Sequence, residues 1–160
     1  MTNMKRKILG LVSLLSCTTS LTYALPFERC PGEAFLIQDR VAQLYSVDLA
    51  TGFSKPLSTP GWTSAKMNAL AFNLSDSYLY AYNYETGSIS RLGADNSVVE
   101  LNANMQGLSF FVGDISPTEN AYYFYRSGSD YGLYRLSLDS LSDNYLSLQK
   151  VISGAALNLK

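Results

Sequence analysis

Tyrosine is the residue type whose spacing most suggests a binding role. One group alternates along a short segment, at Tyr78, Tyr80, Tyr82 and Tyr84. A second group follows further along the chain, at Tyr122, Tyr123 and Tyr125. Alternate side chains of a strand share one face, so such rings could form an aromatic platform for sugars or for a partner's side chains. Rings between two packed sheets would instead fill the core, which is the favoured interpretation. If a platform exists, its candidate ligand-binding residues are Tyr80, Tyr82 and Tyr123.

Trp62 is the single tryptophan of the chain and stands in a loop, after Pro60-Gly61. A ring in a loop is more easily exposed than a ring on a covered strand. Trp62 is therefore the stronger candidate for contact with a ligand. A packed anchor for the loop is still the favoured role.

Histidine is absent from all 160 residues. Its absence excludes a Ser-His-Asp triad and a histidine zinc site. The carboxylates of Asp76, Asp114 and Asp130 could pair as an acid and a nucleophile, and turns near Asp95 or Asp130 could offer oxygens to calcium. These residues stand at strand ends or in turns, where aspartate is favoured for structural reasons. The sequence thus predicts no catalytic residue, no metal site and no cofactor.

The composition favours strands over helices. The chain has 12 tyrosines, is 47% hydrophobic and is only 16% charged. This is enough apolar material for a core and too little charge for a disordered tail. Because Tyr, Ser, Thr and Asn suit strands and turns, we predict an all-β fold.

A repeated unit is the main architectural signal. Three similar segments stand 45 and then 44 residues apart, namely Leu44-Tyr45-Ser46-Val47, Ile89-Ser90-Arg91-Leu92 and Leu133-Tyr134-Arg135-Leu136. In the second unit we predict strands over 67–72, 78–83, 88–92 and 98–101, joined by turns of Ser, Asp, Asn and Gly. An antiparallel meander of four strands that recurs every ~40–45 residues is typical of a β-propeller blade.

We therefore predict a partial β-propeller over residues 25–160, with about three four-stranded antiparallel blades. The predicted blades span about 34–58, 67–102 and 109–151, with an orphan strand over 155–159. Three blades fall short of the roughly four to eight that close a propeller. A truncated piece of a longer propeller is favoured over an open arc completed by a second copy. In an open arc, exposed blade edges would promote self-association.

The first 24 residues are typical of a secretory signal peptide. The basic cluster Lys5-Arg6-Lys7 precedes an apolar run over 8–15, and Thr22-Tyr23-Ala24 offers a cleavage site. The less favoured alternative is a lipoprotein acylated at Cys17, because Leu14-Leu15-Ser16-Cys17 resembles a lipobox. Either interpretation predicts export to the periplasm, the cell surface or the medium. No later stretch has the ~20 apolar residues of a membrane span.

The segment after residue 24 carries one cysteine and a mild excess of acid. Cys30 is expected to be a buried thiol, with an intermolecular bridge or a missing partner as alternatives. Beyond residue 24 the chain has 9 basic and 13 acidic residues and no basic run. Neutralising nucleic-acid phosphates requires a basic surface, so nucleic acid is excluded as a partner.

Several strings together resemble a known but uncharacterised family. They run from Gln43 to Gly52, from Asn68 to Asn73, and from Tyr78 to Asp95. They are similar to a propeller-like repeat domain of secreted and surface proteins of bacteria, over most of residues 30–150. The resemblance implies the fold and the exported location, and it implies truncation because such domains are usually longer. It brings no activity or catalytic residues.

The leading functional hypothesis is an exported, non-enzymatic binding module with an unknown protein or glycan partner, belonging to a cell-surface or adhesion protein. One alternative is a propeller-type hydrolase or lactonase that uses carboxylates and calcium. The other is a non-functional truncated remnant.

Overall fold

The computed structural model describes residues 24–27 and 33–157. The predicted signal peptide up to Tyr23, with Cys17, lies outside the described residues. So do Cys30 and residues 158–160.

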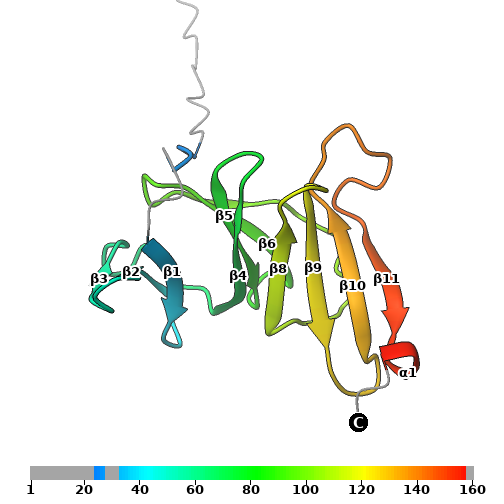
Figure 1. The fold of residues 1–160 in the computed structure, drawn as a ribbon. Coiled ribbons are helices and arrows are strands. Elements are labelled where there is room, and N and C mark those ends of the chain that lie inside the picture. Colours follow the sequence, from blue (N-terminus) through cyan, green and yellow to red (C-terminus); the bar gives the residue numbers. More distant parts are fainter. Residues whose placement is uncertain (1–23, 28–32, 158–160) are drawn as a thin grey trace, which may run out of the picture.

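The strands of the described residues form three antiparallel sheets that follow one another along the chain (Figure 1). The first sheet contains β1 (Glu33–Gln38), β2 (Gln43–Asp48) and β3 (Ser54–Pro56). The second contains β4 (Met67–Asn73), β5 (Tyr78–Asn83), β6 (Ser88–Leu92) and β7 (Val98–Glu100). The third contains β8 (Val112–Ser116), β9 (Ala121–Arg126), β10 (Gly132–Ser137) and β11 (Leu148–Ser153). The predicted all-β fold with blade-like meanders is confirmed.

The turns of the second sheet match the residue types expected for them. Ser77, Gly87 and Asn96 all have positive φ, at 60°, 65° and 62°. The first two stand directly before β5 and β6, and Asn96 stands two residues before β7. Such a backbone is easiest for glycine and tolerated by asparagine. The end of β4 also links two sheets, because the side-chain nitrogen of its last residue, Asn73, donates a hydrogen bond to the Asn120 side chain at 2.9 Å. Turn chemistry therefore sets the strand ends and helps to align neighbouring sheets.

Two hydrophobic layers hold the stack together. The first layer lies between the first and second sheets and includes Leu44, Leu79 and Leu92. The second layer lies between the second and third sheets and includes Tyr82 and Phe124. Alternation on β5 supplies both layers, since Leu79 and Tyr82 point to opposite faces. The second sheet is thus covered on both faces, as expected for a blade inside a propeller.

The predicted orphan strand over 155–159 is wrong for the residues that are described. Residues Gly154–Leu157 form a short helix, α1, packed against the third sheet. Alanine and leucine favour helix, and the Ser153 hydroxyl accepts a hydrogen bond from the Ala156 N–H at 3.3 Å, as at a helix N-terminus. The Gly154 N–H donates to the Tyr131 carbonyl at 2.9 Å. These contacts keep α1 on the third sheet.

Among the described residues, no helix has the length and apolar character needed to cross a membrane.

Candidate functional site

The first strand of each sheet, β1, β4 and β8, has a strand neighbour on one side only. These three inner strands lie next to one another, with β4 packed beside both β1 and β8 (Figure 1). Backbone groups along their free edges are therefore not used by a sheet. In a propeller the first strands of four-stranded sheets, here β4 and β8, surround the central channel. The three-stranded first sheet has no such strand, and β1 matches β5 and β9 in register.

A β-bulge in β4 shapes this region. The pairing of β4 with β5 shifts between Asn68 and Ala71, and Ala69 has a φ of 55°. Extra residues in one strand change which face the side chains point to. Met67 accordingly packs into the first layer, whereas Ala69 and Ala71 pack into the second.

A groove runs along the inner strands. It consists of two neighbouring pockets, of about 300 and 250 Å³, that share Phe35 and Leu70. The larger pocket is lined by Phe35, Leu36, Ile37, Asn68, Ala69, Leu70, Phe111, Val112 and Gly113. The smaller is lined by Glu33, Ala34, Phe35, Leu70, Ala71, Phe72, Leu79 and Asp114. All three inner-strand regions contribute, so the groove exists only once the sheets have packed.

The side chains that line the groove are mainly apolar, with Asn68 in the larger pocket and two carboxylates at one end of the smaller one. Phe111 is 64% exposed and Val112 is 59% exposed, which is unusual for large apolar side chains in a concave site. Glu33 and Asp114 supply the acidic end. The Glu33 carboxylate forms an ion pair with the Lys55 ammonium at 3.2 Å. An apolar groove with few polar groups suits the binding of apolar side chains.

The structure removes Tyr80 and Tyr82 from the candidate ligand-binding residues. They are only 3% and 4% exposed, because the third sheet covers their face of the second sheet. The Tyr80 hydroxyl donates to the Asp76 carboxylate. Burial, and then this hydrogen bond, raise the pKa of Tyr80 well above its ordinary value. These two rings therefore fill the core between the second and third sheets and do not form a platform for a ligand.

Trp62 is half-buried and holds the loop that joins the first two sheets. Its indole N–H donates to the Ala42 carbonyl at 2.6 Å, and its ring packs against the first layer. The position fits the anchoring role that the sequence favours.

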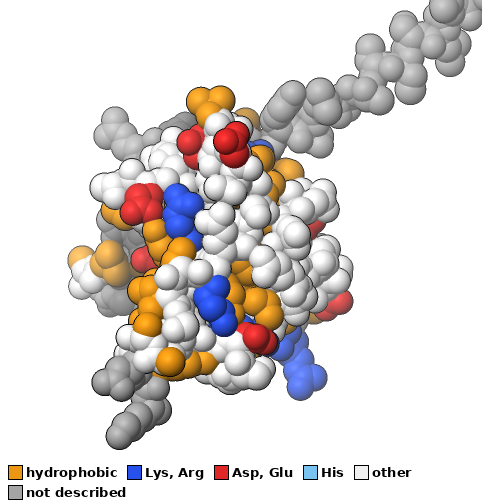
Figure 2. Space-filling view, turned by 90° about the vertical axis from the view of Figure 1, so that its right-hand side faces the viewer, with side chains coloured by type: hydrophobic (Ala, Val, Ile, Leu, Met, Phe, Trp, Pro, Cys, Tyr) orange, Lys and Arg blue, Asp and Glu red, His pale blue; other side chains and the backbone are white. Residues whose placement is uncertain are grey.

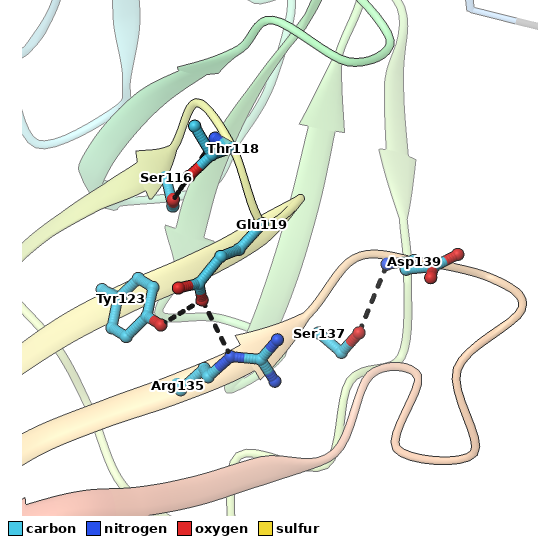
Figure 3. A network of polar contacts seen from close by, with 7 residues as sticks. All are labelled: Ser116, Thr118, Glu119, Tyr123, Arg135, Ser137 and Asp139. Carbon is cyan, nitrogen blue, oxygen red and sulfur yellow. Dashed lines mark hydrogen bonds and ion pairs between the residues drawn. The ribbon is translucent and has the colours of Figure 1, made fainter.

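Tyr123 lies on the opposite face of the third sheet from the second layer (Figure 3). Its hydroxyl donates to the Glu119 carboxylate at 2.5 Å, and Glu119 also pairs with Arg135 at 3.5 Å. The hydrogen bond lowers the pKa of Glu119 and raises the pKa of Tyr123. Tyr123 is half-buried and lies outside the groove, so the structure does not bring the four predicted residues together.

The carboxylates considered for catalysis are separated. Asp76 accepts hydrogen bonds from the Tyr80 hydroxyl and from the Tyr78 N–H, the latter at 3.2 Å. Asp114 lies on β8, and Asp130 lies in the turn between β9 and β10. The described residues hold no cluster of three or more His, Cys, Asp or Glu side chains suited to a metal ion.

Asp95, considered for calcium, is a turn residue. Its carboxylate accepts hydrogen bonds from the Ser97 hydroxyl at 2.5 Å and from the Leu25 N–H at 3.3 Å. The Ser97 bond is the main cause that lowers the pKa of Asp95.

Sequence reasoning missed the groove residues Leu36, Phe111 and Val112. The third predicted blade begins at about residue 109, but its first strand, β8, begins at Val112. Phe110 is instead fully buried in the second layer and Phe111 is exposed in the groove. The apolar run Phe110-Phe111-Val112 was the available signal, yet its pattern does not reveal which ring is covered.

The chain matches the model of a family described as a repeat of unknown function, DUF6923, over residues 35–154. It belongs to this repeat family. The match confirms the resemblance to an uncharacterised repeat domain. A comparison with curated proteins finds no match.

Among solved structures, the chain is similar to one in the crystal structure of a nidogen/laminin complex. The identity is 12% and the TM-score is 0.45, over 68% of this chain and 42% of the other. The chain thus spans less than half the length of that structure. A likeness this weak supports no statement about partners.

Proposed function

We propose that this protein is an exported, non-enzymatic binding module that takes apolar side chains of a protein partner into the groove along β1, β4 and β8. The observation that carries the proposal is the exposure of Phe111 and Val112 inside a concave site. Neighbouring large apolar side chains that are exposed in a groove are typical of interaction sites. Export rests on the basic and apolar residues of the first 24 positions.

A protein partner fits the groove better than a glycan does. Sugar recognition needs polar side chains that converge on hydroxyl groups, beside an exposed ring. The larger pocket offers Asn68 as its single polar side chain, and this group lies 3.5 Å from the Tyr84 hydroxyl. Free strand edges along the groove could also pair with an extended segment of a partner.

A binding role agrees with the chemistry of the lining. The sequence has no histidine to act as a general base. Of the two carboxylates in the groove, Glu33 is engaged by Lys55. The groove therefore offers contact surface rather than an activated group.

Peptide selection tests the proposal. Peptides would be selected from a displayed random library on the immobilised full chain, and their affinities measured for the wild type and for Phe111→Asp. A charge in the groove should weaken the selected peptides by at least about 10-fold, since it would be desolvated without a partner. The matched control is Leu141→Asp, because Leu141 is 92% exposed in the loop between β10 and β11. Peptides that bind Phe111→Asp as tightly as the wild type would refute the groove as the site.

The hydrolase alternative has one observation in its favour, which is that Glu33 and Asp114 line the same pocket. It predicts that calcium raises the melting temperature and that Asp114→Asn abolishes the shift. If calcium leaves the wild-type melting temperature unchanged, this alternative loses its support.

A further inference from the structure

The stack ends in two sheet faces that no other described strand covers (Figure 1). We call the face of a sheet turned toward the next sheet along the chain its C-side face, and the opposite one its N-side face. Inside the stack, each layer joins a C-side face to an N-side face. Within residues 24–27 and 33–157, the C-side face of the third sheet and the N-side face of the first sheet have no such partner.

The free C-side face of the third sheet repeats the covered C-side face of the second. On the second sheet Tyr80 pairs with Arg91 across the strands, and Tyr82 pairs with Ile89. On the third sheet the same register positions are Tyr123 with Arg135, and Tyr125 with Leu133. Each face therefore carries two tyrosines on one strand, with an arginine and an aliphatic residue on the next.

The polar contacts of the two faces also correspond. Tyr80 donates to Asp76, four residues earlier, and Tyr123 donates to Glu119, also four residues earlier (Figure 3). Tyr80 is nearly inaccessible because the third sheet covers it, whereas Tyr123 is only half-buried. The free face thus has the construction of a sheet-to-sheet interface without its second sheet.

Apolar side chains extend across this face. One residue of each strand of the third sheet lies opposite the next across β8, β9, β10 and β11, namely Val112, Tyr125, Leu133 and Ile152. Opposite residues in a sheet share a face, so the four side chains form one row. Figure 2 views the molecule from the side of β11 and shows hydrophobic side chains there, with basic and acidic side chains among them. Three charged groups belong to this face. Glu119 and Arg135 already form an ion pair, and Asp114, which lies opposite Tyr123 on the edge strand β8, is exposed and has to stay at the rim of a covered face.

The free N-side face of the first sheet has the matching construction. It carries Ala34, Leu36, Tyr45 and Val47, none of them charged. The same register positions of the third sheet are Tyr122, Phe124, Tyr134 and Leu136, and all four are buried against the second sheet. In the second sheet they include Leu79, Ala81 and Leu92, which are buried against the first. In both other sheets, then, these positions pack onto a C-side face.

We propose that two copies of this chain pack head to tail. The C-side face of the third sheet of each copy covers the N-side face of the first sheet of the other. The contact continues the interface type that the chain already uses twice. Two copies close a ring of six sheets, within the roughly four to eight of known propellers, whereas three sheets cannot close. A heterologous contact of this kind is satisfied at both ends only when the ring closes.

Sedimentation velocity of the full chain tests the ring. The wild type should form a dimer, and Leu133→Asp or Val47→Asp should each raise the dimer dissociation constant by at least about 100-fold. Leu141→Asp is the control on neither face and should leave the constant unchanged. Tyr125→Asp and Tyr45→Asp are second variants of the two faces, and circular dichroism checks that each variant folds.

The sharpest test is to mix Leu133→Asp with Val47→Asp. Leu133→Asp keeps an intact N-side face and Val47→Asp keeps an intact C-side face, so a mixture can form one good contact. More dimer should appear in the mixture than in either variant alone. The two faces share Val112, Leu36 and Ala34 with the groove, but Leu133 and Val47 do not line it. Loss of the dimer in these two variants with unchanged peptide binding would therefore separate the two proposals.

Three results would overturn the ring. One is a wild type that stays monomeric at about 100 µM, well above the dissociation constants of stable dimers. Another is a dimer that Leu133→Asp breaks but Val47→Asp does not, which would mean that like faces meet. The third is a ladder of ever longer oligomers, which would mean that the contact does not close.

Discussion

The two layers between the sheets differ in what fills them. The second layer has fifteen buried residues among those described, including the rings of Tyr82, Phe110, Tyr122 and Phe124. The first layer has seven, and they are aliphatic residues and methionine rather than rings. Larger rings bury more apolar area, so the second layer should contribute more to stability.

The first sheet explains the difference. It has three strands where the other two sheets have four, and β3 is exposed along its whole length. Its aromatic contacts are made by partly buried rings. The Phe35 ring is stacked on the Phe72 ring at 6.0 Å between centroids and tilted against the Phe27 ring at 5.1 Å. The second and third sheets therefore form the stable part of the molecule, and the first sheet is the part expected to open first.

The largest expected effect comes from removing one leucine from each layer. Leu136 in the second layer and Leu44 in the first are both almost fully buried. Replacing a buried leucine by alanine lowers the free energy of unfolding by about 2–5 kcal/mol. We expect Leu136→Ala to lie near the top of this range and Leu44→Ala near the bottom. Urea unfolding measures both costs. Equal costs would remove the distinction between the layers.

We expect a smaller loss of stability from Gly113→Ala on β8. A Cβ at this position would lie 2.8 Å from the Phe124 ring and 2.9 Å from the Tyr123 carbonyl oxygen. Overpacking of this kind costs about 1–3 kcal/mol. Thermal unfolding tests it, and the loss should shrink in a Phe124→Leu background, where the ring is gone. An unchanged melting temperature for Gly113→Ala would show that the second layer is less tightly packed than we infer.

Alkaline pH should destabilise the second layer specifically. Burial raises the pKa of Tyr122 well above its ordinary value of 10.0. Above pH 10.0 the Tyr122 hydroxyl loses its proton in the unfolded chain but keeps it in the folded chain, so the free energy of unfolding falls as the pH rises. Below pH 10.0 the hydroxyl is protonated in both states, and its contribution to stability does not change with pH.

Tyr122→Phe should reduce the alkaline loss of stability. At neutral pH it should cost about 1 kcal/mol, because the buried Ala69 carbonyl loses the Tyr122 hydroxyl as a donor. Urea unfolding at about pH 8 and about pH 11 separates the two effects. Tyr145→Phe, at an exposed position, is the control and should keep the wild-type pH dependence.

The smallest effect is expected in the first layer, from Trp62→Phe. The substitution removes the hydrogen bond to the Ala42 carbonyl but keeps an aromatic ring, so it should cost about 1 kcal/mol. Hydrogen exchange should then quicken in β1 and β2 and stay unchanged in β9 and β10. Faster exchange throughout the chain would mean that the sheets open together.

Much of the fold could be predicted from local signals. The predicted strands over 78–83 and 88–92 coincide with β5 and β6. Strand alternation and turn residues act between near neighbours, so they can be read in the sequence. The strand predicted over 155–159 is wrong because the segment docks on the third sheet as the short helix α1, through the hydrogen bond from the Gly154 N–H to the Tyr131 carbonyl.

The candidate site could not be predicted in this way. Its lining comes from three sheets, and no local pattern reports that Phe111 is exposed while Phe110 is buried. Both rings belong to the same apolar run, and only their packing distinguishes them.

The sequence by itself determined the all-β class, the meander and the repeat, because spacing and turn chemistry act over a few residues. Only the tertiary structure decided which faces are covered. Tyr80 and Tyr123 occupy the same position of the repeat, yet the first is core and the second is surface. The physical reason is that burial depends on whether another sheet lies against the face, which neither tyrosine nor its neighbours along the strand can determine.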